Sequence, residues 1–384
     1  MDNTIYIKSF ASISSLGSSI KSVTESYAVN KSRIEVEVTG GQNQLIAALK
    51  PEANNDLDRF ILANPNYKPL DRSVQLALFA ASQLDIDKID ANCGVNISSS
   101  RGATELMEKY LREFDQKQTL SPLASPTTTL GNISSWISQH LQLDGIAMSH
   151  SITCSSALHS FANGIAWLKS GMAEQFVVGG SEAPLTPFTL AQMKSLKIYS
   201  EAMDSDYPSN PLYHAPKRNQ MVLGEGASVF LLDKKKDGAI AKIDSIGYAT
   251  EQISHAASLS PDADCLYKSM KMALENSSEE KVDMIIMHAP GTILGDQAEL
   301  NAINKLFGKE KPFLYSNKYL CGHTFGASGA ISVEAALLEL TGATSLEIPY
   351  PISIQQNKPK EIKNIMINAV GFGANAVSII IHDI

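Results

Sequence analysis

The chain has 384 residues, of which 44% are hydrophobic and 19% are charged, the ordinary composition of a globular protein with a large core. Its formal net charge of -8 argues against nucleic acid as a general partner, because binding to phosphates needs a cationic surface. No apolar run reaches the roughly 18 residues of a membrane span. The opening stretch MDNTIYIKSFASISSLG lacks the basic and apolar regions of a secretory signal, so we expect a cytoplasmic protein.

Strand-like and helix-like patterns alternate along the chain, which predicts a layered α/β fold. The strand-like runs are IYIKSFASI (5–13), QFVVGG (175–180), SVFLLD (228–233), VDMIIMH (282–288), NIMINAV (364–370) and AVSIIIHD (376–383). Helical patterns include SVQLALFAASQLDI (73–86) and SALHSFANGIAWLKSG (156–171), whose last glycine suits a helix end. The polar run KKKDG (234–238) is a candidate joint between two halves and is equally compatible with a solvated turn.

The chain has four cysteines and no CxxC pair, so we expect reduced thiols and no structural metal. Cys154, in SITCSSALHS (151–160), lies just before a helical pattern. A free cysteine is most often a small buried side chain, so an inert thiol is one interpretation. The other is a nucleophile, because backbone N–H groups and the helix dipole favour a thiolate at a helix N-terminus.

Four further segments are rich in glycine or contain histidine: VLGEGAS (222–228), MHAPGTILGDQAE (287–299), SNKYLCGHTFGASGA (316–330) and VGFGANA (370–376). Each alone is typical of a turn, and none is a dinucleotide fingerprint or a phosphate-binding loop. Their order after the cysteine resembles the β-ketoacyl synthases, the condensing enzymes of the thiolase superfamily. The resemblance covers nearly the whole chain. It begins at YIKSFASISSLGSS (6–19) and includes LSPLASPTTTLGNISSWISQHL (120–141) and VVGGSE (177–182).

The resemblance implies a thiolase-like five-layer αβαβα fold built from two similar halves. We expect residues 1–235 to carry the nucleophilic cysteine and residues 236–384 to carry two histidines and a lysine. The implied reaction is a decarboxylative Claisen condensation, in which an acyl chain on Cys154 reacts with malonyl acyl carrier protein to give a 3-oxoacyl product and CO2. The family implies no metal or organic cofactor, since the phosphopantetheine arm of the carrier protein holds the substrates.

The resemblance also assigns roles to particular residues. His288 and His323 would donate hydrogen bonds to the developing enolate oxygen, and Lys318 would orient this cluster electrostatically. The backbone N–H groups of Cys154 and Phe372 would form a second oxyanion hole, and Phe372 would also gate acyl entry. An acidic pair, Asp296 and Glu299, is expected to hold the loop after the first histidine.

Several positions depart from the family pattern. Thr292 of HAPGT remains as a substrate-binding residue, but Pro290 replaces a threonine that contacts the phosphopantetheine arm. Ser332 stands where fatty-acid-type members carry the glutamate that pairs with the lysine, and Glu334 is expected to point elsewhere along a helix.

Two further departures concern the acyl pocket. Ala124 falls where many members place a bulky residue against the partner subunit's acyl pocket. Arg101 falls where elongating enzymes often have an apolar gate. Together they suggest a wider and more polar pocket, suited to an aryl or polyene primer in a fatty acid, specialised polyene or polyketide-type pathway.

Acyl carrier protein is the expected partner, and a dimer is expected, either with a second copy or with another ketosynthase-like subunit. Two other classes of protein have a related motif set. A chain-length-factor subunit usually lacks the active cysteine, which is present here. A biosynthetic thiolase should have a second catalytic cysteine near its C-terminus, and none follows Cys321. A purely binding or structural protein explains none of the motif set.

Overall fold

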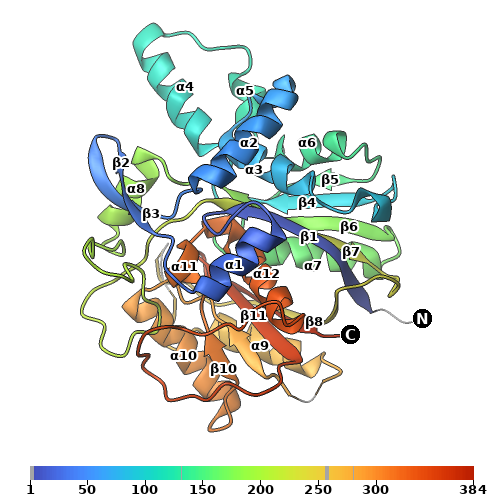
Figure 1. The fold of residues 1–384 in the computed structure, drawn as a ribbon, viewed down its shortest axis with the longest axis vertical. Coiled ribbons are helices and arrows are strands. Elements are labelled where there is room, and N and C mark those ends of the chain that lie inside the picture. Colours follow the sequence, from blue (N-terminus) through green and yellow to red (C-terminus); the bar gives the residue numbers. More distant parts are fainter. Residues whose placement is uncertain (1–3, 131, 256–258, 280) are drawn as a thin grey trace.

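The structure is a computed structural model that describes residues 4–384, apart from residues 131, 256–258 and 280 (Figure 1). Its strands, in chain order within the first half, are β1 (Ile5–Ser14), β4 (Gly94–Ser98), β5 (Ala147–Met148), β6 (Gln175–Glu182) and β7 (Gly226–Asp233). The second half contributes β8 (Ala241–Thr250), β9 (Met284–Ile286), β10 (Phe313–Tyr315), β11 (Asn364–Gly371) and β12 (Asn375–His382). A separate hairpin pairs β2 (Glu35–Thr39) with β3 (Gln42–Ile46).

The two sets of strands have the same order and the same directions. The first is arranged β5-β4-β6-β7-β1 and the second β10-β9-β11-β12-β8, so each reads third, second, fourth, fifth, first. Taken in this sheet order, the first three strands of each set pair in parallel. The remaining two pairings in each set are antiparallel. The sets meet where β1 pairs with β8. This repetition is the structural sign of a duplicated unit.

Helices complete the layers around these sheets. Two of them, α7 (Ser156–Lys169) and α12 (Ser328–Leu340), pack against each other and against strands of both sheets. On the outer side of the first sheet lie α3 (Arg72–Ala81) and α6 (Asn132–His140), and on the outer side of the second lie α9 (Asp264–Glu275) and α10 (Ile293–Phe307). Figure 1 shows the α3 side at the top and the α9 side at the bottom. The expected five-layer thiolase-like fold is confirmed.

The central helices are close together because small residues lie between them. A Cβ added to Gly329 in α12 would come within 2.8 Å of Leu158 Cγ in α7. The segment SGAISVEAALLEL is apolar almost all round, as a helix covered on both sides must be. Its side chains join Phe161, Phe176 and Phe230 in the largest buried cluster, which spans both sheets. This packing fixes the N-terminus of α7, where Cys154 lies.

The predicted strands and helices are present with shifted ends. The VDMIIMH strand is shorter than expected, and the 73–86 pattern forms a helix only to Ala81. KKKDG joins β7 to β8, and VGFGANA turns between the antiparallel β11 and β12. The sequence did not predict the β2–β3 hairpin or the projecting arm of α4 (Thr104–Lys117) and α5 (Ala124–Thr128) (Figure 1).

The remaining helices are α1 (Ile20–Val29), α2 (Pro51–Ala63), α8 (Pro187–Ser195) and α11 (Lys318–Cys321). No helix in the described part of the chain is both long and apolar enough to cross a membrane.

Candidate active site

Cys154 lies in a tight turn directly before α7, whose N-cap is Ser155. Thr153 has a left-handed backbone conformation with φ of 49°, which is uncommon for a β-branched residue. Ser156 holds this turn, since its Oγ donates to the Thr153 carbonyl at 2.6 Å and accepts from the Ile152 N–H at 2.8 Å. The turn therefore presents the thiol from a fixed backbone at the helix start.

The protein environment disfavours the Cys154 thiolate in the unliganded chain. Burial raises the pKa of the thiol to about 12, and the nearby Glu182 carboxylate adds to the effect. Arg101 and the cysteine's own backbone N–H oppose it, but they are the smaller contributions. The favourable effect expected of the helix start is therefore outweighed, because burial disfavours the charged thiolate more than the backbone N–H favours it.

His288 and His323 come from separate loops and meet at the second sheet. Their ring centres are 5.1 Å apart and the rings are perpendicular. Burial lowers the pKa of His288 well below its usual value and that of His323 to about 3, and Lys318 lowers both further. Both rings are thus neutral, each with one N–H to donate. The His323 Nδ1 is buried and has no hydrogen-bond partner among the described residues.

The loop after β9 is held by the acidic pair, as expected. The Glu299 carboxylate accepts the backbone N–H groups of His288 at 3.0 Å and Ala289 at 2.9 Å. Asp296 accepts the N–H groups of Gly291 and Thr292 at 3.1 and 3.2 Å. The two carboxylates therefore fix the backbone that carries His288.

Lys318 is buried, and no carboxylate of the described residues contacts its ammonium. Its Nζ donates to Asn317 Oδ1 and to Ser332 Oγ, both at 2.9 Å. Burial lowers the pKa of this ammonium to about 8. Ser332 therefore gives Lys318 a neutral hydrogen-bond acceptor instead of a carboxylate. A neutral acceptor stabilises the charged ammonium less than an ion pair would.

Glu334 points away from Lys318, as expected, and is buried with a single described partner. Ser12 Oγ donates to its Oε1, while its Oε2 has no partner among the described residues. Burial raises the pKa of this carboxyl to about 7. Ionised Glu334 therefore lowers the free energy of unfolding at neutral and higher pH.

A Glu334→Gln substitution should stabilise the protein, and increasingly so as the pH rises. Below about pH 4.5 the wild-type carboxyl is neutral in both folded and unfolded chains, whereas above about pH 7 it is charged in both. The gain should therefore grow across this window to on the order of 3 kcal/mol. Thermal unfolding at a series of pH values measures it. Glu339→Gln, on the same helix but ion-paired with Lys358, should show no such gain, and a pH-independent difference for Glu334→Gln would contradict the prediction.

The GFG segment lies directly against the cysteine turn. Thr153 Oγ1 donates to the Phe372 carbonyl at 3.1 Å, and Phe372 itself is 39% exposed. A Cβ on Gly371 would overlap Thr153 Oγ1 and approach the Cys154 nitrogen to 2.9 Å. The structure thus brings together the two backbone segments of the expected second oxyanion hole.

A Gly371→Ala substitution should displace the Cys154 turn and lower condensation about 10- to 100-fold, because small misplacements of reacting groups cost rate steeply. Gly171→Ala is a matched control. Its φ is +75° but nothing lies within 4 Å of the added Cβ, so it should cost about 1 kcal/mol of stability and no activity. Condensation rate and melting temperature are measured for both. Full activity in Gly371→Ala would show that this close contact does not position the cysteine.

Arg101 is exposed, and its side chain lies against Phe325. Its guanidinium carbon is 5.2 Å from the centre of the Phe325 ring, and its Nη1 donates to Gln192 Oε1 at 2.5 Å. Phe325 is buried in the cluster that contains Cys154, and its ring centre is 5.5 Å from that of His323. The structure therefore places a cation beside the aromatic ring that links the cysteine and histidine sides.

The other two expected substrate residues lie on other helices. Thr292 is the N-cap residue of α10 and is half-buried. Ala124 begins α5 on the projecting arm and is buried. Its place against a partner's pocket stays a prediction.

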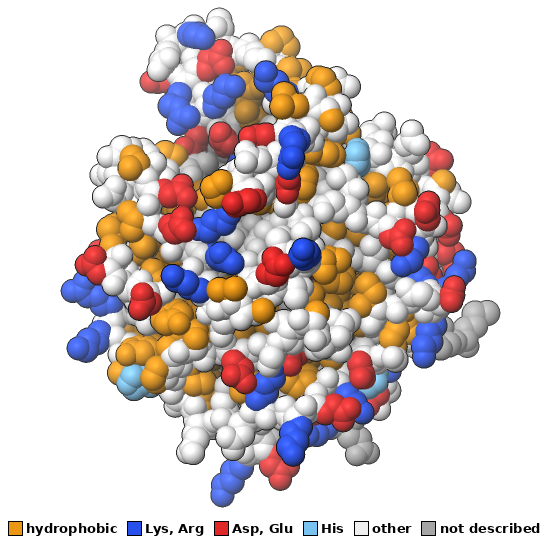
Figure 2. Space-filling view, viewed as in Figure 1, with side chains coloured by type: hydrophobic (Ala, Val, Ile, Leu, Met, Phe, Trp, Pro, Cys, Tyr) orange, Lys and Arg blue, Asp and Glu red, His pale blue; other side chains and the backbone are white. Residues whose placement is uncertain are grey.

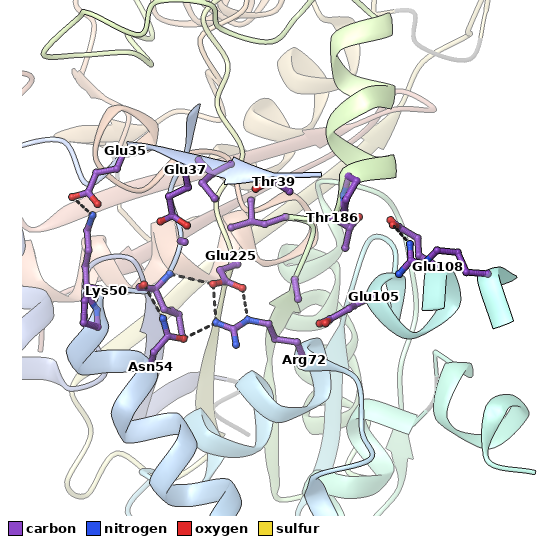
Figure 3. Close-up of a pocket in the computed structure, with 18 residues that line it drawn as sticks. Glu35, Glu37, Thr39, Lys50, Asn54, Arg72, Glu105, Glu108, Thr186 and Glu225 are labelled. Carbon is purple, nitrogen blue, oxygen red and sulfur yellow. Dashed lines mark hydrogen bonds and ion pairs between the residues drawn. The ribbon is translucent and has the colours of Figure 1, made fainter. Parts of the chain in front are cut away.

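A cavity of about 590 Å³ lies apart from these residues, beneath the α4 arm (Figures 2 and 3). Figure 3 shows Arg72 paired with Glu225, with 2.6 Å between Nε and Oε2, and Lys50 paired with Glu35. None of the expected catalytic residues lines the cavity. Glu225 of the GEG segment is thus a structural residue, as its pairing with Arg72 indicates.

Three site residues had no role in the sequence analysis: Glu182, Phe325 and Gln192. Glu182 ends β6 and is fully buried, so a carboxylate at the end of an apolar strand was the available signal. Phe325 stands in GHTFG, two residues after His323, and its left-handed φ of 42° cannot be read from the sequence. Nothing in the sequence around Gln192 on α8 indicates that it belongs to the site.

Comparison with known proteins agrees with this arrangement. Residues 16–238 match the family described as beta-ketoacyl synthase, N-terminal domain, and residues 240–347 match its C-terminal domain. The 3-oxoacyl-[acyl-carrier-protein] synthase 2 of Coxiella burnetii is 24% identical over 96% of each chain. The actinorhodin polyketide putative beta-ketoacyl synthase 1 of Streptomyces coelicolor is 25% identical over 82% of this chain and 74% of that protein.

Solved structures share the fold over nearly the full length. One is a type II polyketide acyl-carrier protein in complex with its ketosynthase, with a TM-score of 0.84, 18% identity and 99% of each chain covered. Another is a ketosynthase in complex with its chain length factor from Xenorhabdus doucetiae. Its TM-score is 0.80 at 21% identity, covering 99% of this chain and 98% of that one.

A thiol at a helix start, two neutral imidazoles and a buried ammonium are groups that an enzyme transferring acyl groups through a covalent intermediate would need. The chain belongs to the β-ketoacyl synthase family. It is an acyltransferase that forms carbon–carbon bonds, of the kind found in fatty acid and polyketide pathways.

Proposed function

We propose that this enzyme condenses an acyl group held on Cys154 with a malonyl group on an acyl carrier protein. The Cys154 thiolate attacks the acyl thioester and the carrier thiol leaves. Loss of CO2 from the malonyl group then leaves its electron pair on the α-carbon as an enolate. That carbon attacks the acyl carbon, and the cysteine thiolate departs as the 3-oxoacyl product forms.

The observation that carries this proposal is the pair of perpendicular, neutral histidines beside the buried ammonium of Lys318. An enolate oxygen needs hydrogen-bond donors that are already in place, and two neutral imidazoles supply them without a change of protonation. The backbone N–H groups of Cys154 and Phe372 would stabilise the tetrahedral oxyanion at the acyl carbon. The reaction uses no metal or organic cofactor, because the carrier's arm holds both substrates.

The proposed primer is an aryl or polyene acyl group rather than a short saturated one. The Arg101 guanidinium lies over the Phe325 ring, and this pair forms a flat, polar surface. A planar conjugated chain stacks on such a surface better than a flexible alkyl chain does. Ala124 and Thr292 are the further proposed substrate contacts. We also propose that the chain divides near residue 235 into two halves, which the repeated strand order supports.

The proposed partners are an acyl carrier protein and a second ketosynthase-like subunit in a cytoplasmic dimer. Relatives with this fold are found in complexes with an acyl-carrier protein or with a chain length factor. Carrier proteins are acidic, and this chain is itself acidic, so docking needs a local group of basic residues. Figure 2 shows acidic and basic side chains interspersed over one face, with several Lys and Arg side chains at its left edge.

Intact-mass spectrometry with a panel of acyl carriers tests the function. Saturated, polyunsaturated and aryl acyl carriers are mixed with the protein, with and without malonyl carrier. We expect an acyl adduct from the conjugated donors that malonyl carrier discharges. Equal turnover of short saturated donors would overturn the primer proposal while leaving the condensing role intact.

An accessory subunit is the second candidate function. Its support is the unfavourable environment of the Cys154 thiol and the lack, among the described residues, of a carboxylate in contact with Lys318. The same experiment decides between the two, because an accessory subunit would take up no acyl group from any donor, alone or with malonyl carrier.

A further inference from the structure

Thr153, the residue before the cysteine, is bonded to a segment that lies 219 residues further along the chain. Its Oγ1 donates to the Phe372 carbonyl at 3.1 Å. This bond joins the turn at the start of α7 to the turn between β11 and β12. Gly371 leaves room for the hydroxyl, since a Cβ at that position would overlap Thr153 Oγ1. The threonine hydroxyl is thus a direct polar link between the two turns.

Each of the two turns is closed by hydrogen bonds of its own. The Thr153 carbonyl accepts the Ser156 hydroxyl at 2.6 Å and the Ser156 N–H at 3.2 Å. The Gly371 carbonyl accepts the Ala374 N–H at 3.0 Å, which closes the turn that carries Phe372. Thr153 also has the left-handed φ of 49°, a conformation that crowds a β-branched side chain and that proteins tend to keep at functional sites. The Thr153 hydroxyl therefore places one closed turn against the other.

Two backbone donors flank this link and have no acceptor within the protein. Neither the Cys154 N–H nor the Phe372 N–H makes a hydrogen bond to another described residue. The two segments are in contact, because a Cβ on Gly371 would lie 2.9 Å from the Cys154 nitrogen. A backbone N–H without an internal acceptor is available to water or to a ligand. Two such donors on touching segments suit an oxygen that becomes negatively charged during a reaction.

We propose that Thr153 is a positioning residue for acyl transfer, whose hydroxyl holds Phe372 so that the N–H groups of Phe372 and Cys154 bind the same oxygen. This inference rests on the proposed function in taking Cys154 as the acyl acceptor. When the thiolate attacks the acyl carbon, the π electrons of the carbonyl move to its oxygen. The leaving group departs with its bonding electrons as that oxyanion collapses. Thr153 acts on this step through Phe372.

The test compares two reactions of the same sulfur atom. In p-nitrophenyl acetate the Cys154 thiolate attacks a carbonyl carbon, an oxyanion forms, and p-nitrophenolate leaves. In iodoacetamide the thiolate displaces iodide from a saturated carbon, and no oxyanion forms. Both rates are followed at Cys154 by mass spectrometry of the modified peptide. Since both reagents need the thiolate, the ratio of acetylation to alkylation reports the stabilisation of the oxyanion separately from the thiolate fraction.

The variants change the hydroxyl while keeping the shape of the side chain. Thr153→Val keeps the β-branch and loses the bond to Phe372, so acetylation should slow about 5- to 20-fold while alkylation stays within about twofold. Thr153→Ser keeps a hydroxyl and should restore most of the acetylation rate. Thr341→Val is the matched control, because the exposed Thr341 at the end of α12 also donates to a carbonyl, that of Leu337 at 2.8 Å. It should match the wild type with both reagents.

Three results would overturn the proposal. They are an unchanged ratio in Thr153→Val, equal slowing of both reagents in that variant, and a wild-type ratio no higher than that of free cysteine. If Thr153→Val does not fold, Thr153→Ala removes the same hydroxyl with less crowding of the left-handed backbone, and the same loss is expected. Neither reagent needs a carrier protein or a malonyl group. A wild-type protein that is acetylated in this test but condenses nothing would therefore count against the proposed function and leave the role of Thr153 standing.

Discussion

A Cys154→Ala variant should take up no acyl group from any carrier and should lose condensation by roughly 10⁴-fold or more, because no covalent intermediate can form. Cys321, the cysteine that precedes His323 by two residues, is a possible alternative acceptor, but its thiol is buried and donates to backbone carbonyls. Intact mass after incubation with an acyl carrier and a continuous condensation assay measure the two losses.

Cys321→Ala is the matched control for this experiment. Its Sγ donates only to backbone carbonyls, Asn317 at 3.4 Å and Gly322 at 3.6 Å, so its loss should leave acylation intact. An acyl adduct of equal stoichiometry on Cys154→Ala would show that another residue is the acceptor. Loss of the adduct in both variants would point to a disturbed fold rather than to chemistry.

A His323→Ala variant should still accept the acyl group but fail to extend it. The ring lies beside His288 and is neutral at any working pH, since burial lowers its pKa to about 3. Its role is therefore to donate a hydrogen bond and not to carry a proton. Loss of one such donor to a developing oxyanion typically costs about 10²- to 10³-fold in rate.

Single-turnover experiments separate the two steps for this variant. The acyl adduct forms first, and its decay on addition of malonyl carrier is then followed by mass. His159→Ala is the control, because His159 lies on α7 and its Nδ1 bonds to the Ser155 carbonyl of the same turn at 3.0 Å. An adduct that decays in His323→Ala as fast as in the wild type would contradict the proposed role.

The pattern of apolar residues determined most of the strands. IYIKSFASI, QFVVGG and the pair NIMINAV and AVSIIIHD are largely apolar, because strands that are buried on both faces have no solvent-facing side to alternate with. The α7 helix was equally clear from its periodicity. The α4 helix was not predicted, although its sequence is amphipathic, and none of its described residues is buried within the chain.

The sequence also determined which residues could meet at the site, through the order of the cysteine, histidine and glycine motifs. That order and the family resemblance identified Cys154, His288, His323 and Lys318. It did not reveal the local electrostatics. The turn at the start of α7 suggested a favoured thiolate, yet burial and Glu182 outweigh the helix terminus.

Only the tertiary structure decided the contacts between distant segments. Lys318 meets Ser332 because α11 and α12 pack together, and Arg101 meets Phe325 because the buried Glu182 carboxylate binds turns from opposite halves of the chain. Spacing in a sequence reports local geometry, such as turns, caps and the faces of helices. Burial, and with it the pKa of each buried group, depends on which distant segments exclude water, so it follows from the packed structure alone.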